Sequence, residues 1–146
     1  MLSVDTNILF HAGNSSSPLQ QAASDFLSGH ARDPEFCICE LVLMELYVLL
    51  RNPAVVEHPL SASRAVAMCQ AYRENRYWRI IDYPGGLMSK IWLYASGPDR
   101  GRRTIFDARL AYTLRHHGVN EFATRDLAHF QDFSFARVWD PLLGSG

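Results

Sequence analysis

The sequence lacks the features of membrane, secreted or redox-active proteins. Its longest strongly apolar stretch, residues 41–50, is interrupted by Glu45 and is about half the length that crosses a bilayer. The N-terminus has no basic segment followed by an apolar one. Only three cysteines occur, Cys37, Cys39 and Cys69, and they form no Cys-x-x-Cys element. We therefore expect a reducing, cytoplasmic compartment, no membrane association, and cysteines that serve as small core residues.

The chain also lacks an excess of charge of either sign. It has 14 basic and 15 acidic residues, which give a net charge of -1 with histidine neutral, whereas a strongly basic domain would indicate nucleic acid. Lys90 is its only lysine, which disfavours a phosphoaspartyl switch that needs a helper lysine. The distribution of the charges must therefore indicate the partner, because their total does not.

Apolar runs alternate with longer helical patterns along the chain. With 146 residues, 48% of them hydrophobic, the sequence suits one domain with a sizeable core. The pattern predicts strands at 2–4, 36–39, 79–82, 121–124 and 136–139, and helices at about 19–28, 40–51, 61–75, 87–95 and 103–117. This alternation is typical of an α/β domain with a mainly parallel central sheet.

Four carboxylates fall at unusual places in this pattern. Asp5 directly follows the first expected strand and Asp126 follows the fourth, so both would lie at the carboxyl edge of the sheet, where ligands bind. Glu45 and Asp107 each fall in the apolar stripe of an expected helix, and the helix around Glu45 is predicted to be buried on most sides. An unpaired buried carboxylate costs several kcal/mol. Each acid must therefore pair with an arginine, cap a helix, or join the others around a divalent cation, for which oxygen-only ligands favour Mg²⁺ or Mn²⁺.

Short motifs surround these acids. They are Val-Asp-Thr-Asn-Ile-Leu at 4–9, the helical segment 40–53, Phe-Asp-Ala-Arg-Leu-Ala at 106–111, and Ala-Thr-Arg-Asp at 123–126. Together, and in this order, they resemble the PIN-domain ribonucleases, and in particular the VapC toxins of bacterial toxin–antitoxin pairs. One stretch departs from the pattern, because Leu127, Ala128 and His129 stand where some relatives carry a further acid.

The resemblance implies a fold, a reaction and a set of metal ligands. The fold would be a three-layer α/β/α sandwich on a mainly parallel sheet, formed by a single PIN-like nuclease domain over residues 1–146. The reaction would be Mg²⁺-dependent hydrolysis of RNA phosphodiester bonds, with Mn²⁺ as a substitute. Asp5, Asp107 and Asp126 would hold the metal, and Glu45 would orient a metal-bound water or complete a second site.

Polar and basic residues near the acids are predicted to assist them. Asn7 and Thr124 would support the carboxylates by hydrogen bonds, or would serve as simple turn and cap residues. The predicted substrate-binding residues are Arg100, Arg102 and Arg103, in a Gly-containing loop before the helix of Asp107, and Arg125 beside Asp126. These arginines would contact RNA phosphates, whereas the alternative is a solvated loop with local ion pairs.

The resemblance also implies partners, namely an RNA substrate, a cognate antitoxin protein and a second copy of the chain in a homodimer. The antitoxin would occupy a groove formed by the apolar faces of the early helices and place a basic side chain near Asp5 and Glu45. Two other functions stay open from the sequence: a PIN-like nuclease of RNA maturation, and a regulatory domain whose acidic pocket binds metal without turnover.

Overall fold

A five-stranded parallel sheet with the order β3-β2-β1-β4-β5 forms the centre of the protein. The computed structural model describes residues 1–144. The strands are β1 (Leu2–Val4), β2 (Phe36–Cys39), β3 (Arg79–Ile81), β4 (Glu121–Ala123) and β5 (Arg137–Trp139). All neighbouring pairs are parallel. The predicted sheet is therefore confirmed, and each strand lies within about one residue of its predicted bounds.

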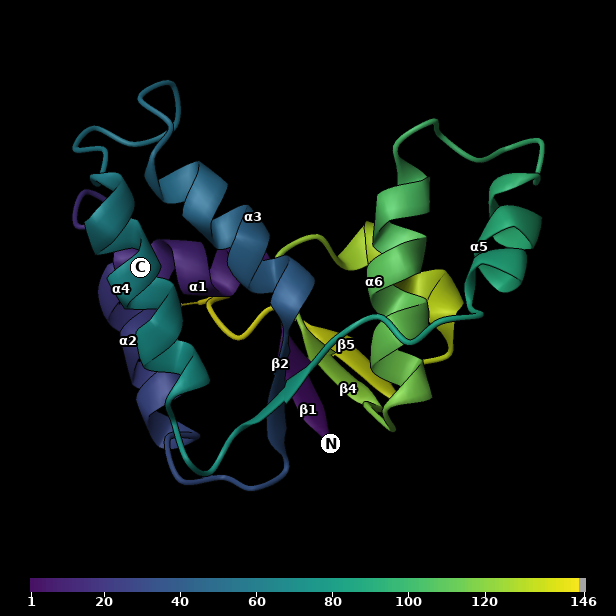
Figure 1. Ribbon diagram of the computed structural model, residues 1–146, viewed down its shortest axis with the longest axis horizontal. Coiled ribbons are helices and arrows are strands. Elements are labelled where there is room, and N and C mark those ends of the chain that lie inside the picture. Colours follow the sequence, from purple (N-terminus) through teal and green to yellow (C-terminus); the bar gives the residue numbers. More distant parts are fainter. Residues whose placement is uncertain (145–146) are drawn as a thin grey trace.

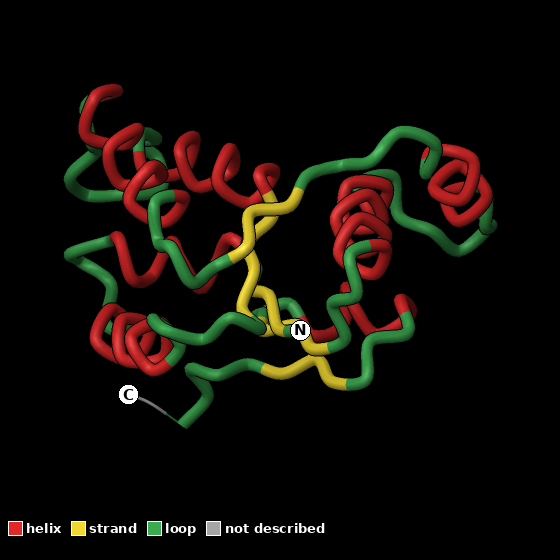
Figure 2. The backbone as a smooth tube through the Cα atoms, turned by 60° about the horizontal axis from the view of Figure 1, so that its bottom comes forward, coloured by secondary structure: helices red, strands yellow, loops and turns green. Residues whose placement is uncertain are grey.

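Helices cover both faces of this sheet. They are α1 (Thr6–Gly13), α2 (Gln20–Gly29), α3 (Glu40–Leu50), α4 (Ala62–Arg73), α5 (Met88–Ala95), α6 (Thr104–His116) and the 3₁₀ helix η1 (Leu127–Phe133). Figure 1 shows α1 to α4 on one side of the strands and α5 and α6 on the other, and Figure 2 shows the strands between these two groups. The α/β/α arrangement is as predicted, whereas α1 and η1 are not among the predicted helices.

Burial follows the position of each strand in the sheet. Every residue of β1 and β2 is buried, whereas the edge strands β3 and β5 are partly exposed. Phe36 and Phe122 are fully buried on the central strands, and Leu46 of α3 and Leu114 of α6 are fully buried on helices of the two flanking groups. Near-continuous apolar runs are typical of parallel strands that helices cover on both faces.

Helix α1 begins directly after β1 because Asp5 caps it. The Oδ1 atom of Asp5 accepts a hydrogen bond of 2.8 Å from the backbone N of Thr6, the first residue of the helix. Ile8 and Leu9 anchor the helix by full burial in the core. A strand and a helix separated by one residue hold the polar side chains of that junction at the carboxyl edge of the sheet.

Helix α3 is less buried than its sequence predicts. Its core-facing residues are Val42, Leu43, Leu46 and Leu50, but Met44 and Val48 are 65% and 60% exposed, and Glu45 is also exposed. The prediction of a helix buried on most sides is therefore wrong. The apolar composition of α3 reflects an exposed apolar face in addition to its core face.

The cysteines and the helix lengths agree with the sequence analysis. Cys37, Cys39 and Cys69 are free thiols and all are buried, which confirms that they are core residues. Along residues 1–144, no helix is both long and apolar enough to span a membrane.

Candidate active site

The carboxyl edge of β1 and β4 carries a connected group of polar side chains. Asp5 is only 7% exposed, and its backbone N donates to the carbonyl of Ala123 at 2.9 Å. The hydroxyl of Thr124 donates to Oδ2 of Asp5 at 2.7 Å, across 119 positions of sequence. Because β1 and β4 are adjacent in the sheet, residues from opposite ends of the chain meet here.

Asn7 links this group to the second strand-end acid. Its Nδ2 atom lies 3.4 Å from Oδ2 of Asp5 and 3.3 Å from Oδ2 of Asp126. Its Oδ1 atom accepts a hydrogen bond from the backbone N of Arg125 at 3.2 Å. The backbone N of Asp126 in turn donates to the hydroxyl of Thr124 at 3.0 Å. Asn7 and Thr124 therefore fix the positions of both carboxylates, as supporting residues would.

Glu45 joins the same group from α3. Its Oε2 atom accepts a hydrogen bond of 2.7 Å from the hydroxyl of Thr6, the residue next to Asp5. Glu45 is thus oriented by the strand–helix junction even though it is exposed to solvent. The sequence analysis missed Thr6, whose only signal was its place between two polar residues of the opening motif.

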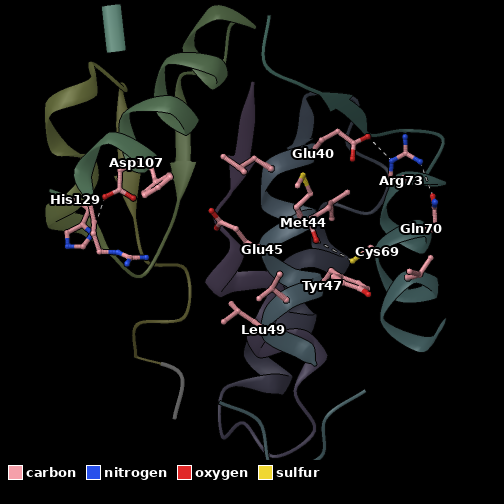
Figure 3. A pocket seen from close by; sticks show the side chains of 16 residues that line it. Glu40, Met44, Glu45, Tyr47, Leu49, Cys69, Gln70, Arg73, Asp107 and His129 are labelled. Carbon is pink, nitrogen blue, oxygen red and sulfur yellow. Dashed lines mark hydrogen bonds and ion pairs between the residues drawn. The ribbon is translucent and has the colours of Figure 1, made fainter. Parts of the chain in front are cut away.

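Asp107 lies on the other side of a groove. Figure 3 shows Asp107 and His129 together on one side and Glu45 on the opposite side. Asp107 belongs to the first turn of α6 and is 3.5 Å from Nδ1 of His129. Its side chain is 28% exposed, so it faces the groove edge and not the apolar core that its helical stripe predicted. The sequence analysis also missed this contact of His129.

The acids perturb one another electrostatically. The pKa of Asp5 is raised to about 6: burial is the main cause, the hydrogen bonds from Thr124 and Thr6 oppose it, and the charges of Asp126 and Glu45 add to it. Burial also raises the pKa of Asp107, the contact with His129 lowers it, and Asp126 and Glu45 again raise it. The acids are therefore near enough to repel one another.

No basic side chain of residues 1–144 except His129 forms an ion pair with any of the four acids. The alternative that each acid has an arginine partner is thus excluded for this part of the chain. The donor atoms are all carboxylate oxygens, which suit a hard divalent cation. Over the same residues, however, no three side chains of His, Cys, Asp or Glu stand close enough together to hold a metal ion. The residues fit Mg²⁺ in charge and donor type, and they do not form a closed ligand cage.

The predicted substrate-binding arginines fall into two groups. The guanidinium of Arg100 pairs with Asp132 at 3.0 Å and lies 4.0 Å from the centre of the Tyr94 ring. The guanidinium of Arg125 pairs with the buried carboxylate of Asp140 at 3.2 Å. These two show the local ion pairs that the sequence analysis left open as the alternative, and their contact with substrate stays a prediction. Arg102 and Arg103 are exposed, and neither has an acidic partner within residues 1–144.

The groove beside the acids has a volume of about 1030 Å³ and mostly apolar walls. Helices α3 and α4 form one wall, and α6 with His129 forms the other. Its exposed apolar residues are Met44, Val48, Val66 and Phe106. Glu45, Asp107 and Arg103 also line it, so the charged groups open onto an apolar cleft.

The parallel sheet with carboxylates at its carboxyl edge agrees with the resemblance to PIN domains, and the chain belongs to that family, because the PIN domain model matches residues 2–136. The chain is 51% identical over its full 146 residues to Ribonuclease VapC24 of Mycobacterium tuberculosis, strains H37Rv and CDC 1551, and covers 100% of each. It also resembles the crystal structure of Mycobacterium tuberculosis VapC20, described as a sarcin-ricin loop cleaving toxin. That likeness has a TM-score of 0.67 and 20% identity, and it covers 92% of this chain and 93% of the other. The resemblance to VapC proteins is thereby confirmed.

Proposed function

We propose that this protein is a Mg²⁺-dependent endoribonuclease and the toxin of a type II toxin–antitoxin pair. The observation that carries the proposal is the uncompensated charge at the sheet edge. The pKa of Asp5 is raised to about 6, in part by the negative charges of Asp126 and Glu45. No lysine or arginine of residues 1–144 forms an ion pair with these three acids. A full-length relative named a ribonuclease and a structural neighbour described as a toxin support the same reaction class.

In this proposal each acid has a defined task. Asp5 and Asp126 hold the cation from the sheet edge, and Asp107 completes the ligand set from the opposite side of the groove. Glu45 orients the attacking water, held in position by its hydrogen bond from Thr6. When bound, Mg²⁺ would polarise the phosphate and lower the pKa of a bound water. Asn7 and Thr124 keep the strand-end carboxylates in place.

The decisive experiment compares RNA cleavage by the wild type and by Asp107→Asn, each with Mg²⁺ and with EDTA. Asp107→Asn keeps the size of the side chain, and circular dichroism checks that the variant is folded. We expect cleavage only by the wild type with Mg²⁺, and its recovery from EDTA when Mn²⁺ is added. Asp25→Asn, an exposed acid on α2, is the matched control and should cleave as the wild type does. Equal cleavage in all four conditions would exclude the proposed reaction.

The antitoxin part of the proposal rests on the α3 and α4 side of the groove. Met44, Val48 and Val66 give this wall an exposed apolar surface, which suits an apolar peptide face. A basic side chain of such a segment would meet the unpaired charges of Asp5 and Glu45. A small reading frame adjacent to this gene, encoding that segment, is what the toxin assignment requires, whereas an RNA-maturation nuclease requires none.

The partner site is tested with Val48→Asp. We expect this charge to weaken binding of the adjacent gene product while RNA cleavage persists, because Val48 is not one of the acids. Val55→Asp is the control, since Val55 is also exposed and lies outside the groove. A structure of the complex in which the partner leaves Asp5 and Glu45 uncovered would contradict the proposed contact.

A further inference from the structure

Phe106 is an isolated aromatic ring in the groove. It precedes Asp107 in the chain, lines the groove and is 60% exposed. Every other phenylalanine of the chain packs against another aromatic ring, including Phe122, Phe130 and Phe133, which pack among themselves. Exposure of a large flat apolar ring to water is unfavourable. The ring is therefore available to a flat ligand.

Arg103, a positively charged side chain, lies one helical turn before Phe106. The backbone N of Phe106 donates to the carbonyl of Arg103, and the side chains of both residues line the groove. Arg103 has no acidic partner within residues 1–144. The α6 wall thus presents an aromatic face, an unpaired positive charge and Asp107 within five consecutive positions.

We propose that Phe106 stacks against an unpaired nucleobase of the RNA substrate, next to the phosphate that is cleaved, while Arg103 contacts the RNA backbone. This inference rests on the proposed nuclease function and adds a structural requirement to its substrate. A base within a duplex has both faces covered by its neighbours, so only a splayed base offers a face to Phe106. Phe106 would therefore contact the RNA only where a base is unpaired.

The charge of Arg103 favours RNA over a basic protein segment at Phe106. Arg103 attracts phosphates, whereas it repels a basic peptide of the kind that would neutralise Asp5 and Glu45. The groove volume of about 1030 Å³ leaves room for nucleotides beside the acids.

The test uses short single-stranded RNAs in which 2-aminopurine replaces one base at a time, bound to the inactive variant Asp126→Asn in Mg²⁺. Stacking quenches 2-aminopurine fluorescence, so we expect quenching at one position of the bound RNA. Adding Phe106→Leu should abolish that quenching and weaken binding about 5- to 100-fold. Adding Phe106→Tyr, which keeps an aromatic ring, should preserve both. Trp92→Leu, an equally exposed aromatic outside the groove, is the control and should change neither.

Other results would overturn the inference. They are unchanged quenching and affinity in the Phe106→Leu protein, no measurable binding of the single strands, or equal quenching of the same strands annealed to their complements. Loss of binding to the partner protein, with RNA binding intact, would place Phe106 in a protein interface. The fluorescence test measures RNA binding and not cleavage, so it can separate the two proposals. If Asp107→Asn still cleaved RNA while Phe106 quenched the bound base, the proposed catalysis would be rejected and the base site would stand.

Discussion

The two sides of the groove hold their acids in different ways. At the sheet edge, Asp5 accepts hydrogen bonds from Thr6 and Thr124, and Asn7 connects it to Asp126. On α6, the side chain of Asp107 makes one polar contact within residues 1–144, with the exposed ring of His129 at 3.5 Å. The first side is fixed before any ligand arrives, whereas the second has little that fixes it.

This difference shows that the fold positions the sheet-edge acids more firmly than the acid on α6. The sheet-edge residues lie within three positions of the ends of β1 and β4, so the backbone hydrogen bonds between these strands fix them. Asp107 projects from the first turn of a helix, where the core residues begin only at Ala108. The absence of a closed ligand cage within residues 1–144 follows from this asymmetry. A cation would have to draw the two sides together.

The largest expected effect is on the sheet-edge side. We predict that Asp5→Asn lowers RNA cleavage about 10³-fold or more, because it removes a charged ligand and leaves the amide in its place. Asparagine still caps α1, so the fold should persist. Single-turnover cleavage at saturating Mg²⁺ measures the effect, with Asp25→Asn as the unaffected control. Activity within about tenfold of the wild type would move the metal away from the sheet edge.

The next prediction concerns stability and pH. Because the folded-state pKa of Asp5 is raised from 3.8 to about 6, the folded protein binds this proton more tightly than the unfolded chain. Its contribution to stability is therefore greatest below the unfolded pKa and is lost as the pH rises through about 6, by up to about 3 kcal/mol. In EDTA, Asp5→Asn should accordingly unfold at higher denaturant than the wild type at about pH 7.5, and Mg²⁺ should stabilise the wild type more than the variant. Identical denaturation curves for the wild type and Asp5→Asn at about pH 7.5 would contradict the burial of a charge that has no ion-pair partner.

The two sides can be compared directly through their supporting residues. Thr124→Val removes a hydrogen bond to Asp5 and one from Asp126, and we expect a loss of about 10- to 100-fold in activity. His129→Gln removes only an exposed ion pair and should cost about 2- to 5-fold. Thr113→Val is the control for the loss of a buried hydroxyl. The hydroxyl of Thr113 donates to the backbone carbonyl of Arg109 within α6, away from the acids. If His129→Gln were the more damaging change, the α6 side would be the more organised one.

The smallest expected effect is the difference in RNA binding between variants of Arg103 and Arg100. Arg103→Ala should weaken RNA binding and reduce the slope of log affinity against log salt by about one. Arg100→Ala should change binding by about twofold or less, because that guanidinium already pairs with Asp132. Salt titrations of RNA binding to the inactive protein measure both. Equal slopes for the two variants would show that Arg100 contacts RNA despite this ion pair.

Features that depend on local pattern could be predicted from the sequence, and contacts between distant segments could not. The strands and helices α2 to α6 follow from apolar periodicity, and Asp5 and Asp126 were found because strand ends in a parallel sheet share one edge. Only one residue lies between β1 and helix α1, so no turn in the sequence separates the two elements. The exposed face of α3 was misread because an apolar residue at a groove and one in a core look identical in sequence. The pairing of Arg125 with Asp140 is a tertiary contact without any local sign.

The link between Asn7 and Asp126 has a consequence for synthesis of the protein. The hydrogen bond spans 119 positions of sequence, so the ribosome must translate most of the message before both partners exist. Fragments that end before β4 lack Thr124 and also Asp126, one of the four acids. The acid cluster is therefore completed only late in translation, when β4 supplies the residues that hold Asp5.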